Sequence, residues 1–340
     1  MSTNIPASFD SAPFGPGQPS RTSIVVAALR AFGAREPDPT VRNPDWLAER
    51  MVMPVDLVLI HDHPVASALA QEYTTARKNA EAAGMSNLLV VRTRYIDDRL
   101  KRAIESGVTQ FVILGAGLDT RAYRFAKELE GKPIFEVDYH STQELKKRRL
   151  KDIFGALPAN VHFTEIDFKR DSLGEVLAAA GYRPTEKTFF LWEGVSMYLS
   201  TDAVQKTLRT ISSYSTPGSS LVMDFAEQAS IRLFAKFPNL SQHKYTTRWG
   251  EPWIFGLPDM KERDFFRRCG LELREILGLF SREAEKRYLT RADGSLLGHA
   301  WGRPPSNRAH LTTTRILWFF MTHRSRWYAI ADLVVPQSIV

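Results

Sequence analysis

Several short apolar stretches of this sequence end in residues that can bind a small polar ligand. The first lies in FVILGAGLDTRAYRF (residues 111–125) and runs into Gly115 and Gly117. Because glycine has no Cβ, the backbone there can approach a ligand, and the helix expected to follow presents N–H groups that favour negative charge. The second stretch, PIFEVD, ends at Asp138, whose carboxylate can accept hydrogen bonds from both hydroxyls of a ribose.

Two further stretches supply what an adenosine site would still need. TEIDF ends in Asp167, an acid that can receive an amino group, and Phe168, whose ring can lie against an adenine. LWEGVSMYL carries Glu193, which can hold an ammonium group or a ribose edge. Taken singly, each acid is equally well explained as an ordinary residue at a strand end, and Gly-x-Gly is a weak pattern. Since parallel strands end at the same edge of a sheet, where ligands bind, the set together favours a bound adenosine.

The glycine pattern departs from that of dinucleotide sites. A Gly-x-Gly-x-x-Gly/Ala fingerprint would place a small residue at Thr120, which is followed here by Arg121, and this counts against NAD. S-adenosylmethionine has no pyrophosphate, but its amino-acid end needs a cation for the carboxylate. Arg94 in VRTRYIDDRL is a candidate for that cation. The alternative for Arg94 is a surface salt bridge with Asp98 on the next helical turn.

The elements that must position these residues follow from the apolar periodicity. Residues 21–107 carry apolar side chains at helical spacing, in segments that end at glycines, and predict a helical extension. From residue 108 short apolar runs alternate with helical segments, which is typical of a mostly parallel sheet covered by helices on both faces. LELREILG and WYAIADLVV are candidates for the last strands.

Composition places limits on the class of protein. The chain has 340 residues, 44% hydrophobic and 24% charged, which suits a large α/β domain. The net charge is +7, but the basic residues are dispersed among acids apart from LKKRRLK (145–151), which we interpret as the solvated face of a helix. Nucleic acid is therefore not expected as a partner. Residues 1–20 resemble a flexible leader without a signal peptide, and no stretch suits a membrane span, so we expect a cytoplasmic protein that does not bind a membrane.

Five ordered motifs give this chain a family resemblance. RTRYIDDRL, VILGAGLDTRAYR, FEVDYHSTQELKKRRL, TEIDF and LWEGVSMYLS resemble the leucine carboxyl methyltransferase family, in particular its bacterial branch of S-adenosylmethionine-dependent methyltransferases. The resemblance spans roughly residues 21–225. It departs at His140, where the family often has proline.

The resemblance implies a fold, a cofactor and a role for each candidate residue. The fold would be an α/β class I methyltransferase, with a seven-stranded, mostly parallel, Rossmann-like sheet, a helical N-terminal extension and a late lid insertion. The cofactor would be S-adenosyl-L-methionine. The implied roles are Arg94 binding the methionine carboxylate, Gly115 and Gly117 passing under the methionine end, Asp138 holding the ribose, Asp167 and Phe168 flanking the adenine, and Glu193 lying beside the methionine moiety.

These observations predict a methyltransferase that acts on an oxygen of a small molecule. A carboxylate, with a pKa of about 4, is already ionised at neutral pH and needs no general base, and an acidic hydroxyl needs little help. The competing interpretations are an NAD-dependent oxidoreductase and a non-catalytic adenosine-binding protein. We expect a monomer or a homodimer, and we identify no catalytic residue.

Two segments outside the cofactor motifs have open interpretations. Residues 227–310 are predicted to form the lid or acceptor insertion of a core domain that spans 108–340. Within them RWGEPWIFG (248–256) either lines an acceptor pocket or contributes its aromatic rings to the core. The His61–His63 pair in HDHP has no third ligand at a suitable spacing, so we expect it to lead into a helix at Pro64 and predict no metal site.

Overall fold

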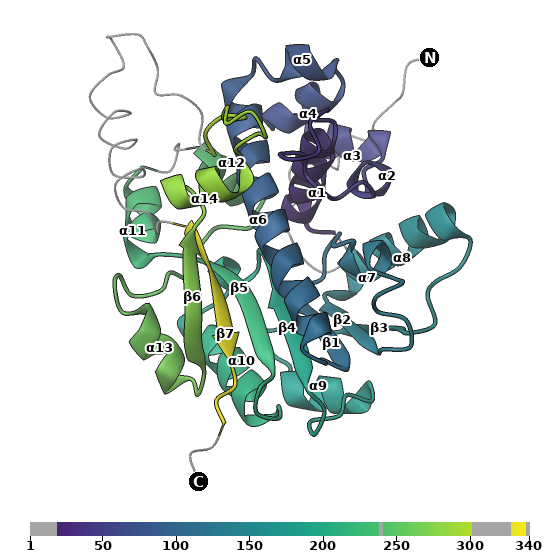
Figure 1. Ribbon diagram of the computed structural model, residues 1–340, viewed down its shortest axis with the longest axis vertical. Helices are drawn as coiled ribbons and strands as arrows, with labels where there is room; N and C mark the ends of the chain where they lie inside the picture. The colour runs from purple at the N-terminus through teal and green to yellow at the C-terminus, as the bar shows by residue number, and fades with distance from the viewer. Residues whose placement is uncertain (1–18, 238–240, 301–327, 338–340) are drawn as a thin grey trace.

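A single seven-stranded sheet forms the centre of the molecule (Figure 1). The computed structural model describes residues 19–237, 241–300 and 328–337. The strand order is β3-β2-β1-β4-β5-β7-β6, and all neighbouring strands are parallel except β7, which is antiparallel to β5 and β6. The strands are β1 (Gln110–Leu114), β2 (Ile134–Asp138), β3 (Val161–Glu165), β4 (Thr188–Trp192), β5 (Ser220–Ala226), β6 (Glu272–Gly278) and β7 (Tyr328–Val334). This sheet confirms the predicted fold class, and both candidates for the last strands are strands.

Helices cover both faces of the sheet, as the apolar runs predicted. Phe111 and Ile113 of β1 point into an apolar cluster shared with the long helix α6, whereas Val112 and Leu114 point into a second cluster with α9, α10 and α13. Side chains alternate between the faces of a strand, so a strand covered on both sides is apolar along its whole length. The helical elements after β1 are α7 (Arg121–Arg124), α8 (His140–Phe154), α9 (Leu173–Ala179), η2 (Ser196–Tyr198), α10 (Thr201–Ser213), α11 (Gln228–Lys236), α12 (Ser241–Arg248), α13 (Glu262–Arg268) and α14 (Arg282–Tyr288).

The predicted helical extension is present and lies at one end of the sheet. Figure 1 shows α1–α5 grouped above the strands, beside α12 and α14, while α6 crosses the front face. These helices are α1 (Arg21–Ala34), α2 (Ala48–Met51), α3 (Pro54–Leu59), α4 (Pro64–Leu69), α5 (Tyr73–Ala76) and α6 (Ala80–Glu105). One of the helical segments predicted to end at a glycine is PVASALAQEYTTARKNAEAAG (64–84). It breaks near Glu72 and Asn79, whose side chains cap α5 and α6, so Gly84 lies inside α6. Side-chain capping has overridden a continuous apolar period.

The segment 227–310, predicted as a lid or acceptor insertion, contributes a strand to the sheet. It includes β6, which pairs with β7, so the segment does not lie wholly outside the sheet.

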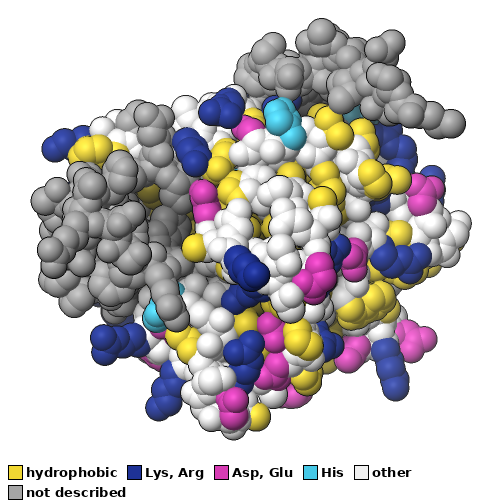
Figure 2. Space-filling model, turned by 90° about the horizontal axis from the view of Figure 1, so that it is seen from above, with side chains coloured by type: hydrophobic (Ala, Val, Ile, Leu, Met, Phe, Trp, Pro, Cys, Tyr) yellow, Lys and Arg dark blue, Asp and Glu magenta, His cyan; other side chains and the backbone are white. Residues whose placement is uncertain are grey.

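The predicted flexible leader, residues 1–20, falls almost entirely outside the described residues. Across the ranges that the structure describes, no helix is both long and apolar enough to cross a membrane. On the face seen in Figure 2, basic and acidic side chains are interspersed over the described surface.

The basic run LKKRRLK is only partly solvated, contrary to expectation. Lys146 is 1% exposed and its Nζ lies 2.7 Å from a carboxylate oxygen of Glu136 on β2. Arg149 is also buried and forms an ion pair with Asp56 of α3 at 2.5 Å. The interpretation as a solvated face was wrong because both side chains find buried carboxylates on other elements to compensate for their charge.

Gly115, which follows β1, offers a test of this packing. Its φ is +63°, and a Cβ built there would lie 2.1 Å from Cγ2 of Val195. We expect Gly115→Ala to lower the free energy of unfolding by roughly 1 to 2 kcal/mol through the backbone conformation and roughly 1 to 3 kcal/mol more through the clash. Urea unfolding measures this loss.

Gly181→Ala is a matched control, because Gly181 has φ +90° and open space around its Cβ position. A Val195→Ala substitution should recover part of the loss in the Gly115→Ala background. Equal destabilisation of the two glycine variants would contradict the packing explanation.

Candidate functional site

A cavity of about 640 Å³ lies at the carboxyl edge of the sheet, where the sequence predicted an adenosine site. The volume is typical of a site for a small molecule. Six of the seven predicted site residues line it: Gly115, Gly117, Asp138, Asp167, Phe168 and Glu193. The other walls come from α1, α6, η2 and residues 246–254, with Tyr328 at the start of β7.

The turn after β1 needs glycine for its backbone conformation. Gly115 and Gly117 have φ values of +63° and +43°, a region that side chains disfavour. At Gly115 the space of the missing Cβ is occupied by Val195, whereas a Cβ at Gly117 would only contact the Cβ of Ser23, at 3.4 Å. Gly115 therefore lets the loop after β4 pack closely against the turn.

Asp138 is tied to the glycine turn. One carboxylate oxygen accepts a hydrogen bond from the backbone N–H of Gly117, and the other accepts one from the N–H of Tyr139 at 2.6 Å. Burial raises the pKa of Asp138, and these two N–H donors oppose the shift. The carboxylate is thus held rigidly at the cavity wall with lone pairs left for a ligand.

Asp167 and Phe168 lie together near the start of the loop that connects β3 to α9. The Oδ1 of Asp167 accepts a hydrogen bond from the N–H of Lys169 at 2.9 Å. The ring of Phe168 lies 6.3 Å from that of the buried Trp192. The predicted pairing of an acid and a ring is therefore present on the cavity wall.

Arg94 is the predicted residue that the structure does not bring to the cavity. Its guanidinium donates to the backbone carbonyls of Arg42 at 2.9 Å and Pro39 at 2.6 Å. Arg92 lines the cavity instead. The reason is helical geometry. Arg92 and Arg94 are two positions apart in α6, so their side chains point in directions that differ by about 200° around the helix axis, and only one of them can face the sheet.

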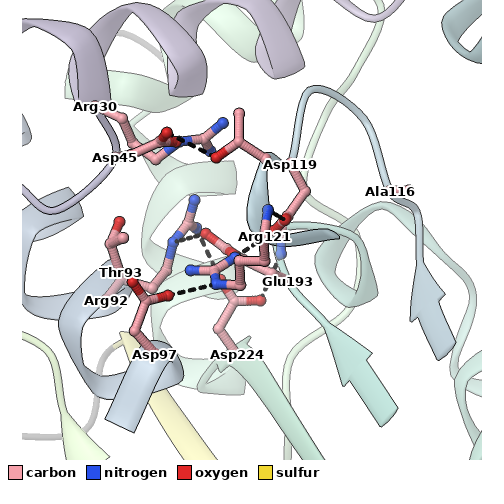
Figure 3. A network of polar contacts seen from close by, with 12 residues as sticks. Arg30, Asp45, Arg92, Thr93, Asp97, Ala116, Asp119, Arg121, Glu193 and Asp224 are labelled. Atoms are coloured by element: carbon pink, nitrogen blue, oxygen red, sulfur yellow. Dashed lines mark hydrogen bonds and ion pairs between the residues drawn. The ribbon is translucent and has the colours of Figure 1, made fainter. Parts of the chain in front are cut away.

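Arg92 and Arg121 both bind Glu193, which lies between them in Figure 3. The Nε of Arg92 and the Nη1 of Arg121 lie 2.7 and 2.6 Å from the two oxygens of Glu193. Burial raises the pKa of Glu193, but the two guanidinium charges outweigh burial and hold that pKa below its ordinary value. Glu193 is therefore ionised at neutral pH.

The network continues to β5 and β7. Arg92 donates through Nη1 to Asp224 at 2.8 Å and to the hydroxyl of Tyr328 at 2.7 Å, and Tyr328 in turn donates to Asp224. The Nη2 of Arg92 is buried and has no hydrogen-bond partner among the described residues. A buried donor without a partner on a cavity wall suits a ligand carboxylate.

A second part of the network braces the turn after β1. Arg121 also binds Asp119 and Asp97, and it lies 3% exposed. Arg30 of α1 donates to the carbonyl of Leu118 at 2.7 Å and forms an ion pair with Asp45 at 2.8 Å. Helix α1, α6 and the turn are thus linked by buried charge pairs.

Some aromatic residues of the segment 248–256 line the cavity and others belong to the core. Trp249 and Trp253 line the cavity, with the ring of Trp253 5.5 Å from that of Tyr328. Phe255 is 2% exposed and belongs to the core cluster under α13. The hydroxyl-bearing Tyr198 and Tyr328 complete an aromatic region beside the network.

The histidine pair has a structural role. The Nδ1 of His63 accepts a hydrogen bond from the N–H of Val65 and caps α4, which begins at Pro64 as predicted. Burial, with a contribution from the charge of Lys244, lowers the pKa of His63 to about 3. His61 is exposed, with its Nδ1 2.9 Å from the carbonyl of Val58.

Several site residues were not predicted from the sequence. Arg92, Asp224 and Tyr328 join the network, and Glu251 lies where α1 begins. A signal for Arg92 existed, because Arg92 is one helical turn before Ile96 on the apolar stripe of α6 and a charge on such a stripe must be buried. Glu251 had no comparable signal.

Comparisons with known proteins identify the family of this chain. The family model for leucine carboxyl methyltransferase matches residues 23–212. Two relatives are named as putative S-adenosyl-L-methionine-dependent methyltransferases. The one from Mycolicibacterium smegmatis is 36% identical over a region that covers 60% of this chain and 65% of the relative. The one from Bacillus subtilis is 30% identical over a region that covers 62% of this chain and 71% of the relative. The aligned part of this chain thus spans just under two thirds of the first of these relatives.

Solved structures support the fold alone. A putative methyltransferase from Thermobifida fusca is 15% identical over 99% of this chain and 100% of that chain, with a TM-score of 0.52. A DUF574 family protein from Streptomyces avermitilis is 12% identical over 91% of this chain and 97% of that chain, also with a TM-score of 0.52. Together with the relatives, these findings confirm the predicted family, fold class and cofactor.

A binding experiment separates the predicted residues that reach the cavity from the one that does not. Asp138→Ala should weaken S-adenosylhomocysteine binding by roughly 1 to 3 kcal/mol, or roughly 5- to 150-fold, since a charged acceptor is lost. Arg94→Met should change the dissociation constant by no more than about twofold. Isothermal titration calorimetry measures both constants, and melting temperatures control for folding. A large loss in the Arg94 variant would return Arg94 to the cofactor site.

Proposed function

Because this chain belongs to the leucine carboxyl methyltransferase family, we propose that it transfers the methyl group of S-adenosylmethionine to a carboxylate or acidic hydroxyl oxygen of a small molecule. One observation supports this most directly: a single cavity joins the acids and glycines at the strand ends to a separate aromatic region. A methyltransferase needs such a cavity, because donor and acceptor must meet in line.

We assign the groups that hold the cofactor from their positions on the wall. Arg92, with its unpartnered Nη2, suits the methionine carboxylate in place of Arg94. Glu193 is ionised beside it and suits the ammonium group. Asp138 suits the ribose, while Asp167 and Phe168 suit the adenine. When bound, S-adenosylmethionine supplies an electrophilic methyl group on a positively charged sulfur.

The chain's own task is then to orient the acceptor and exclude water. Trp249, Trp253 and Tyr198 form an apolar wall with hydroxyl and indole groups, which can align a small acceptor. A carboxylate or acidic hydroxyl arrives ionised or nearly so, and its oxygen attacks without help from a strong base. Among the described residues, no histidine lines the cavity.

Features of the described structure count against the other interpretations. Thr120 is buried and donates to Asp45 at 2.7 Å, where a dinucleotide site would have a small residue for close helix packing. The interspersed surface charges do not suggest a nucleic-acid partner. We retain as proposals a cytoplasmic enzyme, monomeric or homodimeric, in which residues 108–340 form the core domain and residues from 227–310 contribute to the acceptor region.

A product assay tests the acceptor chemistry. Carboxylic acids, phenols and C-terminal peptides are incubated with S-adenosylmethionine carrying a labelled methyl group. We expect a base-labile ester or the ether of an acidic hydroxyl, because neither product requires a general base. A methylated amine would refute the oxygen assignment. Binding of NAD, with no response to S-adenosylhomocysteine, would refute the proposed function itself.

Trp253 offers a second test, on the acceptor side alone. Trp253→Ala enlarges the aromatic region without removing a proposed cofactor contact. We therefore expect its relative kcat/KM for two accepted substrates of different size to change by roughly 10- to 100-fold, while S-adenosylhomocysteine affinity stays within about twofold. Unchanged discrimination between those substrates would place acceptor recognition elsewhere.

A further inference from the structure

Glu251 connects two segments that lie far apart in the sequence. It follows α12 directly and is 7% exposed, on the cavity wall. Its carboxylate accepts four hydrogen bonds from the start of α1: from the hydroxyl of Ser20 at 2.8 Å, from the hydroxyl of Thr22, and from the N–H groups of Arg21 and Thr22 at 3.0 and 3.3 Å.

These contacts join both oxygens of Glu251 to N–H and O–H groups at the start of α1. Backbone N–H groups at a helix N-terminus stabilise negative charge, and hydrogen bonds to an ionised acceptor are the stronger kind. Burial raises the pKa of Glu251, and the donors Thr22 and Ser20 oppose that shift. The carboxylate therefore has its binding partners concentrated on α1.

The turn that Glu251 holds lines the cavity that we propose for the cofactor. Ser23 approaches Gly117, where an added Cβ would be 3.4 Å from that of Ser23. The N–H of Ser20 lies 3.4 Å from the hydroxyl of Thr142, in the first turn of the helix that follows Asp138. The start of α1 thus covers the glycine turn on the side where Asp138 binds it.

We propose that Glu251 is a positioning residue of the cofactor site, which fixes the first turn of α1 over Gly117 and so closes the cavity around bound S-adenosylmethionine. This inference rests on the proposed function for its ligand. Glu251 acts through α1 and does not need to touch the reacting atoms. Release of cofactor or product then requires the contacts between Glu251 and α1 to open.

Binding and release of S-adenosylhomocysteine test the proposal. Glu251→Ala should raise the dissociation constant roughly 10- to 100-fold and raise the dissociation rate with it. Glu251→Gln, which keeps the shape and one acceptor oxygen, should recover part of the affinity. Thr22→Val should weaken binding, and the double variant Thr22→Val/Glu251→Ala should bind no worse than Glu251→Ala, because both remove the same contact.

Glu49→Gln is the matched control, since Glu49 pairs with Arg35 beyond the other end of α1 at 2.7 Å on the surface. It should leave affinity and release rate unchanged. Affinity of Glu251→Ala within about twofold of the parent, or additive losses in the double variant, would overturn the proposal.

Hydrogen exchange of the ligand-free protein separates this inference from the proposed function. Glu251→Ala should speed amide exchange in residues 21–26 and leave the strands protected, because only the first turn of α1 is released. Unchanged exchange there would overturn the role of Glu251 whatever the ligand is. Faster exchange in a protein whose parent form does not bind S-adenosylhomocysteine would support the contact and refute the proposed function.

Discussion

The carboxylate of Glu193, buried between Arg92 and Arg121, is the interaction on which the rest of the site depends. Arg92 comes from α6, Arg121 from the turn after β1 and Glu193 from the end of β4, so one carboxylate joins three segments. Removing one partner of a buried pair leaves an uncompensated charge, which is strongly destabilising. The elements around the cavity are thus held in one relative position.

Buried pairs also support the cavity from below. Lys146 lies beneath the glycine turn, paired with Glu136 and 3.4 Å from the carbonyl of Ala116. Its charge acts to lower the pKa of Asp138 against the effect of burial. A turn that must keep positive φ values is in this way braced by charge on its inner side and by α1 on its outer side.

Much of the sheet and half of the site were predictable from local sequence. A strand covered on both faces is continuously apolar, so its end and the acid that follows are visible without any tertiary information, as at Asp138 and Glu193. Arg94 shows the limit of this reasoning: the motif RTRYIDDRL contains three arginines, and of these Arg92, one turn before Ile96 on the apolar stripe of α6, is the one that lines the cavity.

The burial of Lys146 and the role of Glu251 could not be predicted, because both depend on contacts between different elements of the fold. Lys146 resembled a surface residue because its partner Glu136 is on a different element. The contact between Glu251 and Thr22 joins residues that are 229 positions apart. Neither a period nor a motif records such a pair, since only the folded chain brings the two side chains together.

The position of β7 has a consequence for the order in which the molecule can be assembled. This strand follows every other described strand in the chain, yet it lies between β5 and β6. During synthesis β5 and β6 therefore emerge without the strand that joins them, and each presents an unpaired edge. Tyr328, which begins β7, supplies a hydroxyl to both Arg92 and Asp224. The nascent chain can thus complete its ligand cavity only after this strand has left the ribosome.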